Sequence, residues 1–354
     1  MTACPQCDIE AGPEDRFCEA CGAALDGTSR PADPPTRPTG AERRKNCRCP
    51  PDDIDPDGTG YCRACGFRLP QTPPHDEPSL VLPIDDDLAA VSDRGARYRK
   101  GRWTNQDAAT AARLYDGAAM LAVADGVSSS NGATRASAAA VAALRFVLQS
   151  SDETEPPVTV MRRAIAAAHE AVKNVTVPNP DPAKDPPETT IAAALVRDGK
   201  ATLGWVGDSR VYMVQGERGR LLTRDDSWMA EVLHAGVMSR EDAQADRRAH
   251  SITQCLGVPD AELTIHVEQA SVRPGAWLVL CTDGLWNYLD DAGRLAGALS
   301  ELPAETDALT RCQRLVLIAN ESGGHDNISV AMLRIGPDEP RPGAIWRKRH
   351  RSPI

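Results

Sequence analysis

The sequence lacks the features that mark membrane, secreted and nucleic-acid-binding proteins. Aromatic residues make up only 4% of the 354 residues. No run of about 18 consecutive apolar residues occurs, so we expect no membrane-spanning segment. The N-terminus has neither a basic start nor an apolar core, so we expect no secretory signal peptide. These absences predict a cytoplasmic protein without a membrane partner.

An excess of positive charge is also absent, because the formal net charge is −10 at pH 7. Residues 1–88 hold 17 of the 50 acidic residues but only 9 of the 40 basic residues. A protein that binds a phosphate backbone needs a basic face, so this distribution disfavours a nucleic-acid partner. An N-terminal module that binds nucleic acid is therefore the weakest of three hypotheses that we consider.

The 11 cysteines are concentrated near the N-terminus. Without an export signal, they indicate metal ligands or reduced thiols rather than disulfides. Residues 1–25 resemble a zinc ribbon with two Cys-x-x-Cys pairs, and residues 47–69 resemble a second, less regular one. Segments of about 20 residues are too small to fold without a metal, so we expect one or two structural Zn²⁺ ions. The predicted ligands are Cys4, Cys7, Cys18, Cys21, Cys47, Cys49, Cys62 and Cys65.

Two alternatives remain open for these cysteines: pairing across the two modules, and free thiols.

The segments 26–46 and 70–88 are rich in proline and are predicted to be linkers. Residues 89–336 have a globular composition, and residues 337–354 are predicted to be a tail.

The globular segment alternates apolar, strand-like runs with amphipathic helices. Helical periodicity is found at 133–149, 158–175 and 309–321. The strands and helices do not alternate one for one, which favours an α+β sandwich over a doubly wound parallel sheet. Four aspartates each lie at one end of a short apolar run: Asp125, Asp208, Asp283 and Asp326. Carboxylates beside buried strands need a partner, and a hard divalent cation would serve all four.

The order and spacing of seven short motifs resemble a known family. The motifs are Ser92-Asp93-Arg-Gly95, Arg102-x-x-Asn105-Gln106-Asp107, Ala124-Asp125-Gly126, Thr189-Thr190, Val206-Gly-Asp208-Ser209-Arg210, Thr282-Asp283-Gly284 and Asp326-Asn327. Residues 90–335 resemble the bacterial branch of the metal-dependent type 2C Ser/Thr protein phosphatases. This resemblance implies a four-layer α-β-β-α fold, with two antiparallel sheets packed face to face and flanked by helices. It also implies hydrolysis of phosphoserine and phosphothreonine by a water that two metal ions activate.

The resemblance assigns metal-binding roles to individual residues. Asp125 would bridge two Mn²⁺ or Mg²⁺ ions, and the carbonyl of Gly126 would bind the second ion. Asp283 and Asp326 would bind the first ion. Asp208 matches an aspartate that, in the bacterial branch, helps to hold a third, looser ion. Carboxylate and carbonyl oxygens are the ligands that these hard ions prefer.

Two further residues receive catalytic roles from the resemblance. Asp107 would contact metal-bound water, and Arg102 would grip the substrate phosphate. A guanidinium matches the geometry of a phosphate group, which is why arginine suits this position. The alternatives without a catalytic role are that Asp107 caps a turn and that Arg102 is one solvated charge among several. His325 is a further candidate, for protonating the leaving group.

The chain also departs from the family pattern. Gln106 stands where glutamate is usual, Val127–Ser130 replaces a glycine-containing segment, and Asp226 stands where histidine is common. No departure removes a predicted metal ligand. The expected partners are therefore phosphoproteins, including cytosolic Ser/Thr kinases and their targets, with a separate protein partner for the zinc modules. The competing hypothesis is an inactive phosphatase-like protein that binds phosphoproteins or scaffolds a complex.

Overall fold

The computed structural model describes residues 80–96, 104–249, 251–261 and 263–336, together with two short strands near the N-terminus. The chain divides into two compact units, Met1–Pro73 and Pro74–Ile354. In the first unit, β1 (Thr2–Ala3) pairs antiparallel with β2 (Glu10–Ala11). The eight cysteines predicted to bind zinc, and Arg102, lie outside the described residues.

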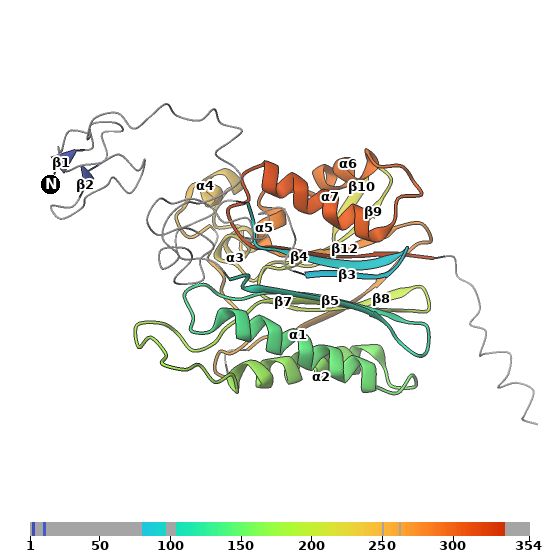
Figure 1. Ribbon diagram of the computed structural model, residues 1–354, viewed down its shortest axis with the longest axis horizontal. Helices are drawn as coiled ribbons and strands as arrows, with labels where there is room; N and C mark the ends of the chain where they lie inside the picture. The colour runs from blue at the N-terminus through green and yellow to red at the C-terminus, as the bar shows by residue number, and fades with distance from the viewer. Residues whose placement is uncertain are drawn as a thin grey trace, which may run out of the picture. The chain divides into compact units, whose positions relative to one another are not determined.

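The second unit contains two antiparallel sheets (Figure 1). The six-stranded sheet has the order β10 (Arg218–Leu221), β9 (Arg210–Gln215), β12 (Trp277–Cys281), β13 (Ile328–Arg334), β4 (Leu88–Asp93) and β3 (Leu80–Asp85). The five-stranded sheet has the order β11 (His266–Ser271), β8 (Lys200–Val206), β7 (Ile191–Arg197), β6 (Ala119–Asp125) and β5 (Asp107–Arg113). Every pairing within the two sheets is antiparallel, which confirms the predicted sheet class.

Helices cover the outer face of each sheet, so the unit has four layers (Figure 1). The helices α1 (Ala133–Ser150) and α2 (Pro157–Lys173) pack on the five-stranded sheet. The helices α6 (Ala292–Ser300) and α7 (Ala308–Glu321) pack on the six-stranded sheet. The α-β-β-α architecture predicted from the sequence is confirmed. None of the helices in the described part of the chain is long and apolar enough to cross a bilayer.

The period of two in each strand divides its side chains between two cores. In β6, Leu121 and Val123 face the opposite sheet, whereas Met120 and Ala122 face α1 and α2. In β4, Leu88 and Ala90 face the opposite sheet, whereas Ala89 and Val91 face α7. Because these strands are buried on both faces, their sequences are nearly continuous apolar runs rather than alternating ones.

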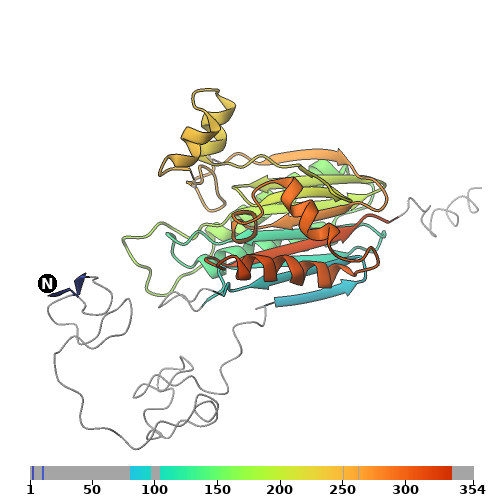
Figure 2. The ribbon, with the colours of Figure 1, turned by 90° about the horizontal axis from the view of Figure 1, so that it is seen from above.

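The structure differs from the sequence prediction at the start of this unit. β3 lies within 70–88, the segment predicted to be a linker, and forms an edge strand against β4. The sequence of this strand does not predict it clearly, because its side chains are mostly exposed and it contains Pro83. An edge strand needs to bury only part of one face. Two short helices, α3 (Trp228–His234) and α4 (Arg240–Ala245), project away from the sheets (Figure 2).

Candidate functional site

The directions of the strands bring the predicted aspartates to one end of the five-stranded sheet. Neighbouring antiparallel strands run in opposite directions, so the start of one meets the end of the next. β5 starts at Asp107 and β6 ends at Asp125, and these two residues are directly paired. β8 ends at Val206, opposite Ile191 at the start of β7, and Asp208 follows two residues later.

The six-stranded sheet contributes its aspartates at the same end of the sandwich. β12 ends at Cys281, and the short helix α5 (Asp283–Trp286) begins two residues later. Asp326 lies two residues before the first residue of β13, which pairs with β12. The hydroxyl of Thr282 joins the two sheets, because it donates a 2.8 Å hydrogen bond to Oδ2 of Asp107. The structure therefore brings five of the predicted site residues into one cluster.

Glycines allow the backbones around this cluster to approach closely. A Cβ at Gly284 would lie 1.9 Å from the carbonyl oxygen of Asn327. A Cβ at Gly126 would lie 2.4 Å from the carbonyl oxygen of Ala133. The Asp-Gly pairs that marked the sequence thus have a steric reason: glycine follows the carboxylate because any side chain would collide with the neighbouring backbone.

The carboxylates strongly perturb one another. Desolvation, opposed by the Thr282 hydrogen bond and reinforced by the negative charges of Asp283 and Asp326, raises the pKa of Asp107 to about 8. Desolvation and the charge of Asp326 raise the pKa of Asp283 to about 6. The pKa of Asp125 lies well above its ordinary value, through desolvation and then the charge of Asp107.

Asp208 belongs to the same electrostatic cluster. Desolvation, followed by the charges of Asp283 and Asp225, holds its pKa well above the ordinary value. Asp107 and Asp208 are 8% and 6% exposed, whereas Asp125, Asp283 and Asp326 are only half-buried. The cluster is therefore anchored in the protein and open to solvent on the side of the half-buried carboxylates.

The residues present fit hard divalent cations. Oδ1 of Asp283 is buried without a hydrogen-bond partner in the described part of the chain, and its second oxygen accepts a 3.3 Å bond from Asn287. The raised pKa values show that the negative charges are poorly compensated by the protein itself. Oxygen-only donors with excess negative charge suit Mg²⁺ or Mn²⁺ rather than a sulfur-ligated metal.

Two threonines that immediately precede β7 orient Asp125. The hydroxyl of Thr189 donates a 2.7 Å bond to the carbonyl oxygen of Asp125, and the Asp125 amide donates to the Thr190 hydroxyl at 3.1 Å. The Thr190 amide also donates to the Asp125 carbonyl at 2.8 Å. The Thr-Thr motif singled out in the sequence therefore fixes the backbone from which the Asp125 carboxylate projects.

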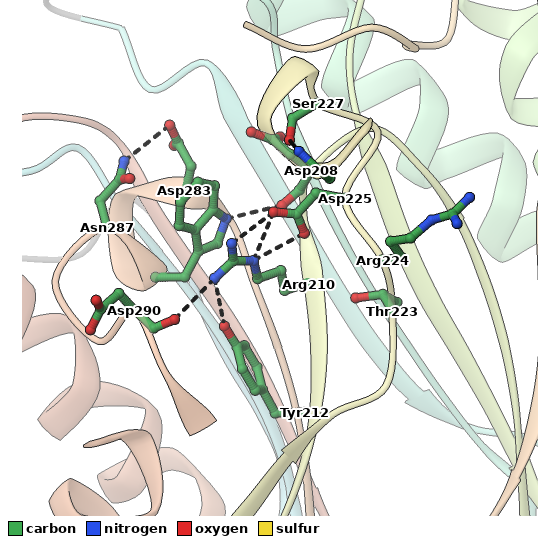
Figure 3. A network of polar contacts seen from close by, with 12 residues as sticks. Asp208, Arg210, Tyr212, Thr223, Arg224, Asp225, Ser227, Asp283, Asn287 and Asp290 are labelled. Atoms are coloured by element: carbon green, nitrogen blue, oxygen red, sulfur yellow. Dashed lines mark hydrogen bonds and ion pairs between the residues drawn. The ribbon is translucent and has the colours of Figure 1, made fainter. Parts of the chain in front are cut away.

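Sequence reasoning missed the ion pair that lies beneath Asp208. The pair is formed by Arg210, the last residue of the Asp208-Ser209-Arg210 motif. The guanidinium is buried and forms an ion pair with Asp225 at 2.7 Å (Figure 3). Asp225 lies 15 residues further along the chain, and spacing alone does not show that the two meet.

The departures from the family pattern also have structural partners. Gln106 accepts a 2.8 Å hydrogen bond from the hydroxyl of Ser128, so two of the departing positions contact each other. Asp226 accepts a bond from the Gly207 amide at 2.9 Å and contacts Nε2 of His266 at 2.8 Å. Asp226 therefore stabilises the turn that leads into Asp208.

His325 is exposed beside Asp326, and its ring contacts Tyr288. The ring nitrogen Nδ1 lies 2.5 Å from the hydroxyl of Tyr288, which also accepts a 3.0 Å bond from the His325 amide. A chemical role for His325 stays a prediction.

A second acidic cluster, of His169, Glu170 and Asp260, does not have the character of a metal site. Nδ1 of His169 accepts a bond from the Gly257 amide at 3.2 Å, so Nε2 carries the proton that faces Asp260 at 3.1 Å. The ammonium of Lys173 lies 2.5 Å from Asp260 and 3.1 Å from Glu170. A cation already occupies this cluster.

Comparison with known proteins identifies similar sequences and structures. The family profile described as Protein phosphatase 2C matches residues 94–315. The chain is 31% identical over 151 residues to protein phosphatase PhpP of Streptococcus pneumoniae serotype 2 (strain D39 / NCTC 7466). That alignment covers 43% of this chain and 59% of the pneumococcal protein, less than two thirds of its length.

Solved structures with the same fold include a mycobacterial one. The crystal structure of the Mycobacterium tuberculosis serine/threonine phosphatase PstP/Ppp matches with a TM-score of 0.58 and 25% identity, over 73% of this chain and 100% of that chain. A crystal structure of the catalytic domain of PstP in complex with 2 manganese ions matches with a TM-score of 0.56 and 25% identity. That match covers 71% of this chain and 98% of the other.

Proposed function

Because the chain belongs to the protein phosphatase 2C family, we propose that it is a metal-dependent phosphatase that hydrolyses phosphoserine and phosphothreonine in proteins. The observation that carries this proposal is the cluster of five aspartates at one end of the two sheets, in which the pKa values of Asp107, Asp125, Asp208 and Asp283 are raised by burial and by neighbouring carboxylates. Such a cluster is unfavourable in the absence of cations, and it is open to solvent where a substrate would enter.

Four residues would hold two divalent cations: Asp125, the carbonyl of Gly126, Asp283 and Asp326. Asp208 would help to hold a third. Bound cations would supply charge neutralisation for the phosphate group and would lower the pKa of an attacking water towards about 7. Similarity to a PstP catalytic domain crystallised with 2 manganese ions supports Mn²⁺ or Mg²⁺ as the cations.

The protein's own residues would orient this centre and the substrate. Thr189 and Thr190 hold the Asp125 backbone, and Thr282 holds the carboxylate of Asp107 towards the cluster. Asp107 would accept a proton or orient solvent at the edge of the centre, and Arg102 would bind the phosphate oxygens. Positions fixed by buried hydrogen bonds need little reorganisation during the reaction, which is how such a site lowers a barrier.

The cellular setting follows from the same proposal. The substrates would be cytoplasmic phosphoproteins, including Ser/Thr kinases and their targets. The N-terminal cysteines would form one or two structural zinc ribbons, whose acidic surroundings favour a protein partner over nucleic acid.

Hydrolysis assays test the proposal directly. The purified chain should hydrolyse p-nitrophenyl phosphate and a phosphothreonine peptide with Mn²⁺ or Mg²⁺ and lose activity in EDTA. Asp125→Ala and Asp283→Asn should lose most activity, whereas Asp260→Asn, an exposed aspartate of the second cluster, should retain it. A folded, metal-loaded chain that is inert on both substrates would instead favour a phosphoprotein-binding role.

A further inference from the structure

The guanidinium of Arg210 lies between an aromatic ring and a carboxylate beneath the metal-binding end of the sheets (Figure 3). Its carbon Cζ is 3.8 Å from the centroid of the Trp286 ring. Nε and Nη2 donate to Asp225 at 3.0 Å and 2.7 Å, and Nη1 donates to the hydroxyl of Tyr212 at 3.1 Å. The guanidinium is thus fixed in both position and plane.

Trp286 connects this guanidinium to two of the predicted metal ligands. It is the last residue of α5, the single-turn helix that begins at Asp283. Its indole N–H donates a 3.0 Å hydrogen bond to the carbonyl oxygen of Asp208. Asp208 follows β8 of the five-stranded sheet and Asp283 follows β12 of the six-stranded sheet, so Trp286 joins elements from the two sheets.

The burial of this ion pair argues for a role in geometry. The side chains of Arg210 and Asp225 are only 9% and 8% exposed. Desolvation offsets much of the attraction within a buried ion pair, so such a pair is a weak source of stability compared with apolar packing. A planar, bidentate and stacked arginine is well suited to fixing the positions of its neighbours.

We propose that Arg210 is a positioning residue that holds Trp286 against Asp208 and so sets the spacing between the carboxylates of Asp208 and Asp283. This inference rests on the proposed function, because the spacing matters for a cation held between these two residues. The first two cations would also be held by Asp125 and Asp326, which are attached to other strands, so those cations would depend less on Arg210 than the third cation at Asp208. Loss of Arg210 should therefore weaken one class of cation sites selectively.

The chain contains a second buried ion pair of arginine and aspartate at the other end of the sheets, which serves as a control. Arg197 and Asp116 also form a buried ion pair, with an N–O distance of 2.7 Å and side chains that are each 8% exposed. Arg197 is the last residue of β7, whereas the carboxylate cluster lies near the first residue of that strand. Arg197→Met should therefore cost stability without touching the cation sites.

Calorimetric titration of the full chain with Mn²⁺ tests the proposal, with thermal unfolding measured in parallel. Arg210→Met and Arg197→Met should lower the melting temperature by similar amounts. Only Arg210→Met should weaken the weakest class of Mn²⁺ sites, by about tenfold or more, and leave the tightest class unchanged. Arg210→Lys keeps the charge but not the bidentate, stacked geometry. Relative to Arg210→Met, it should therefore recover most of the stability but less of the Mn²⁺ binding.

Trp286→Phe keeps the proposal testable if Arg210→Met does not fold. Phenylalanine retains a ring beneath the guanidinium but lacks the N–H that reaches Asp208, so the same selective loss of Mn²⁺ binding is expected. Mn²⁺ binding in Arg210→Met and Trp286→Phe that equals that of Arg197→Met would overturn this inference alone. A wild-type chain that binds no Mn²⁺ would overturn the proposed function and this inference together.

Discussion

Asp107 and Asp125 lie directly opposite each other at the paired ends of β5 and β6. Like charges in directly opposed positions destabilise a sheet, and here the pKa of each carboxyl is raised by desolvation and by neighbouring carboxylates. The folded protein therefore contains an unfavourable electrostatic interaction at the end of the two sheets where the aspartates lie. Divalent cations would relieve it, which links cation binding to stability and predicts the behaviour of several variants.

Replacing Asp125 with asparagine should separate stability from activity. The neutral amide removes one negative charge from the cluster, so the metal-free protein should gain about 1–2 kcal/mol, or a few degrees in melting temperature. Mn²⁺ should stabilise this variant less than the wild type, and phosphatase activity should fall on the order of 100-fold or more. Thermal unfolding in EDTA and in Mn²⁺ gives both quantities. A lower melting temperature in EDTA would show that Asp125 is not under electrostatic strain.

The metal-free protein should lose stability as the pH rises from about 5 to 8. The pKa of Asp107 is raised from 3.8 to about 8, and that of Asp283 to about 6, so the folded state holds protons that the unfolded chain releases. This stabilisation is fully present at a pH below the pKa of the unfolded chain. It is lost as the pH rises through the pKa values of the folded state, at up to about 1.4 kcal/mol per pH unit for each group. Because bound Mn²⁺ would replace these protons, its stabilising effect should grow with pH. Melting temperatures in EDTA that stay flat or rise over this range would contradict the electrostatic argument.

Gly284→Ala should distort the end of the sheets that carries the aspartates, because the new methyl group would lie 1.9 Å from the carbonyl oxygen of Asn327. Displacing a backbone carbonyl is costly, and we expect a loss of about 1–3 kcal/mol of stability together with weaker Mn²⁺ binding. Gly297→Ala is the matched control, since a Cβ at this helical glycine meets nothing within 4 Å. The control should be neutral or stabilising by about 0.5–1 kcal/mol. Equal stabilities of the two variants would show that the close approach at Gly284 is not required.

The N-terminal cysteines should hold zinc. Elemental analysis of the purified full chain should find about one or two Zn²⁺ ions per chain, since four thiolates close each tetrahedral site. Substitution of Cys4 and Cys7 by serine should remove about one ion, because too few thiolates would remain at the first site. The unit Pro74–Ile354 has its own core, so its thermal transition should persist in that variant. A chain free of zinc would favour the alternative of reduced, unligated thiols.

Much of the fold was predictable because strands and helices leave local periodic signals. The helices predicted at 133–149, 158–175 and 309–321 are found within two residues of those bounds at each end. Edge strand β3 was missed because a partly exposed strand with a proline carries a weak signal. The gathering of Asp125, Asp208, Asp283 and Asp326 was predictable as well, since each aspartate lies at one end of an apolar run and antiparallel strands bring such ends together.

The sequence by itself thus determined the layers, the strand ends and the identity of the carboxylates, because those properties depend on residue type and on spacing along the chain. Only the tertiary structure decided what surrounds the carboxylates. The Arg210–Asp225 pair, the bond from Trp286 to Asp208 and the contact of Ser128 with Gln106 join residues whose separations follow no period. Such contacts arise where loops from different strands meet, and their geometry is set by the packing of two sheets rather than by local propensity.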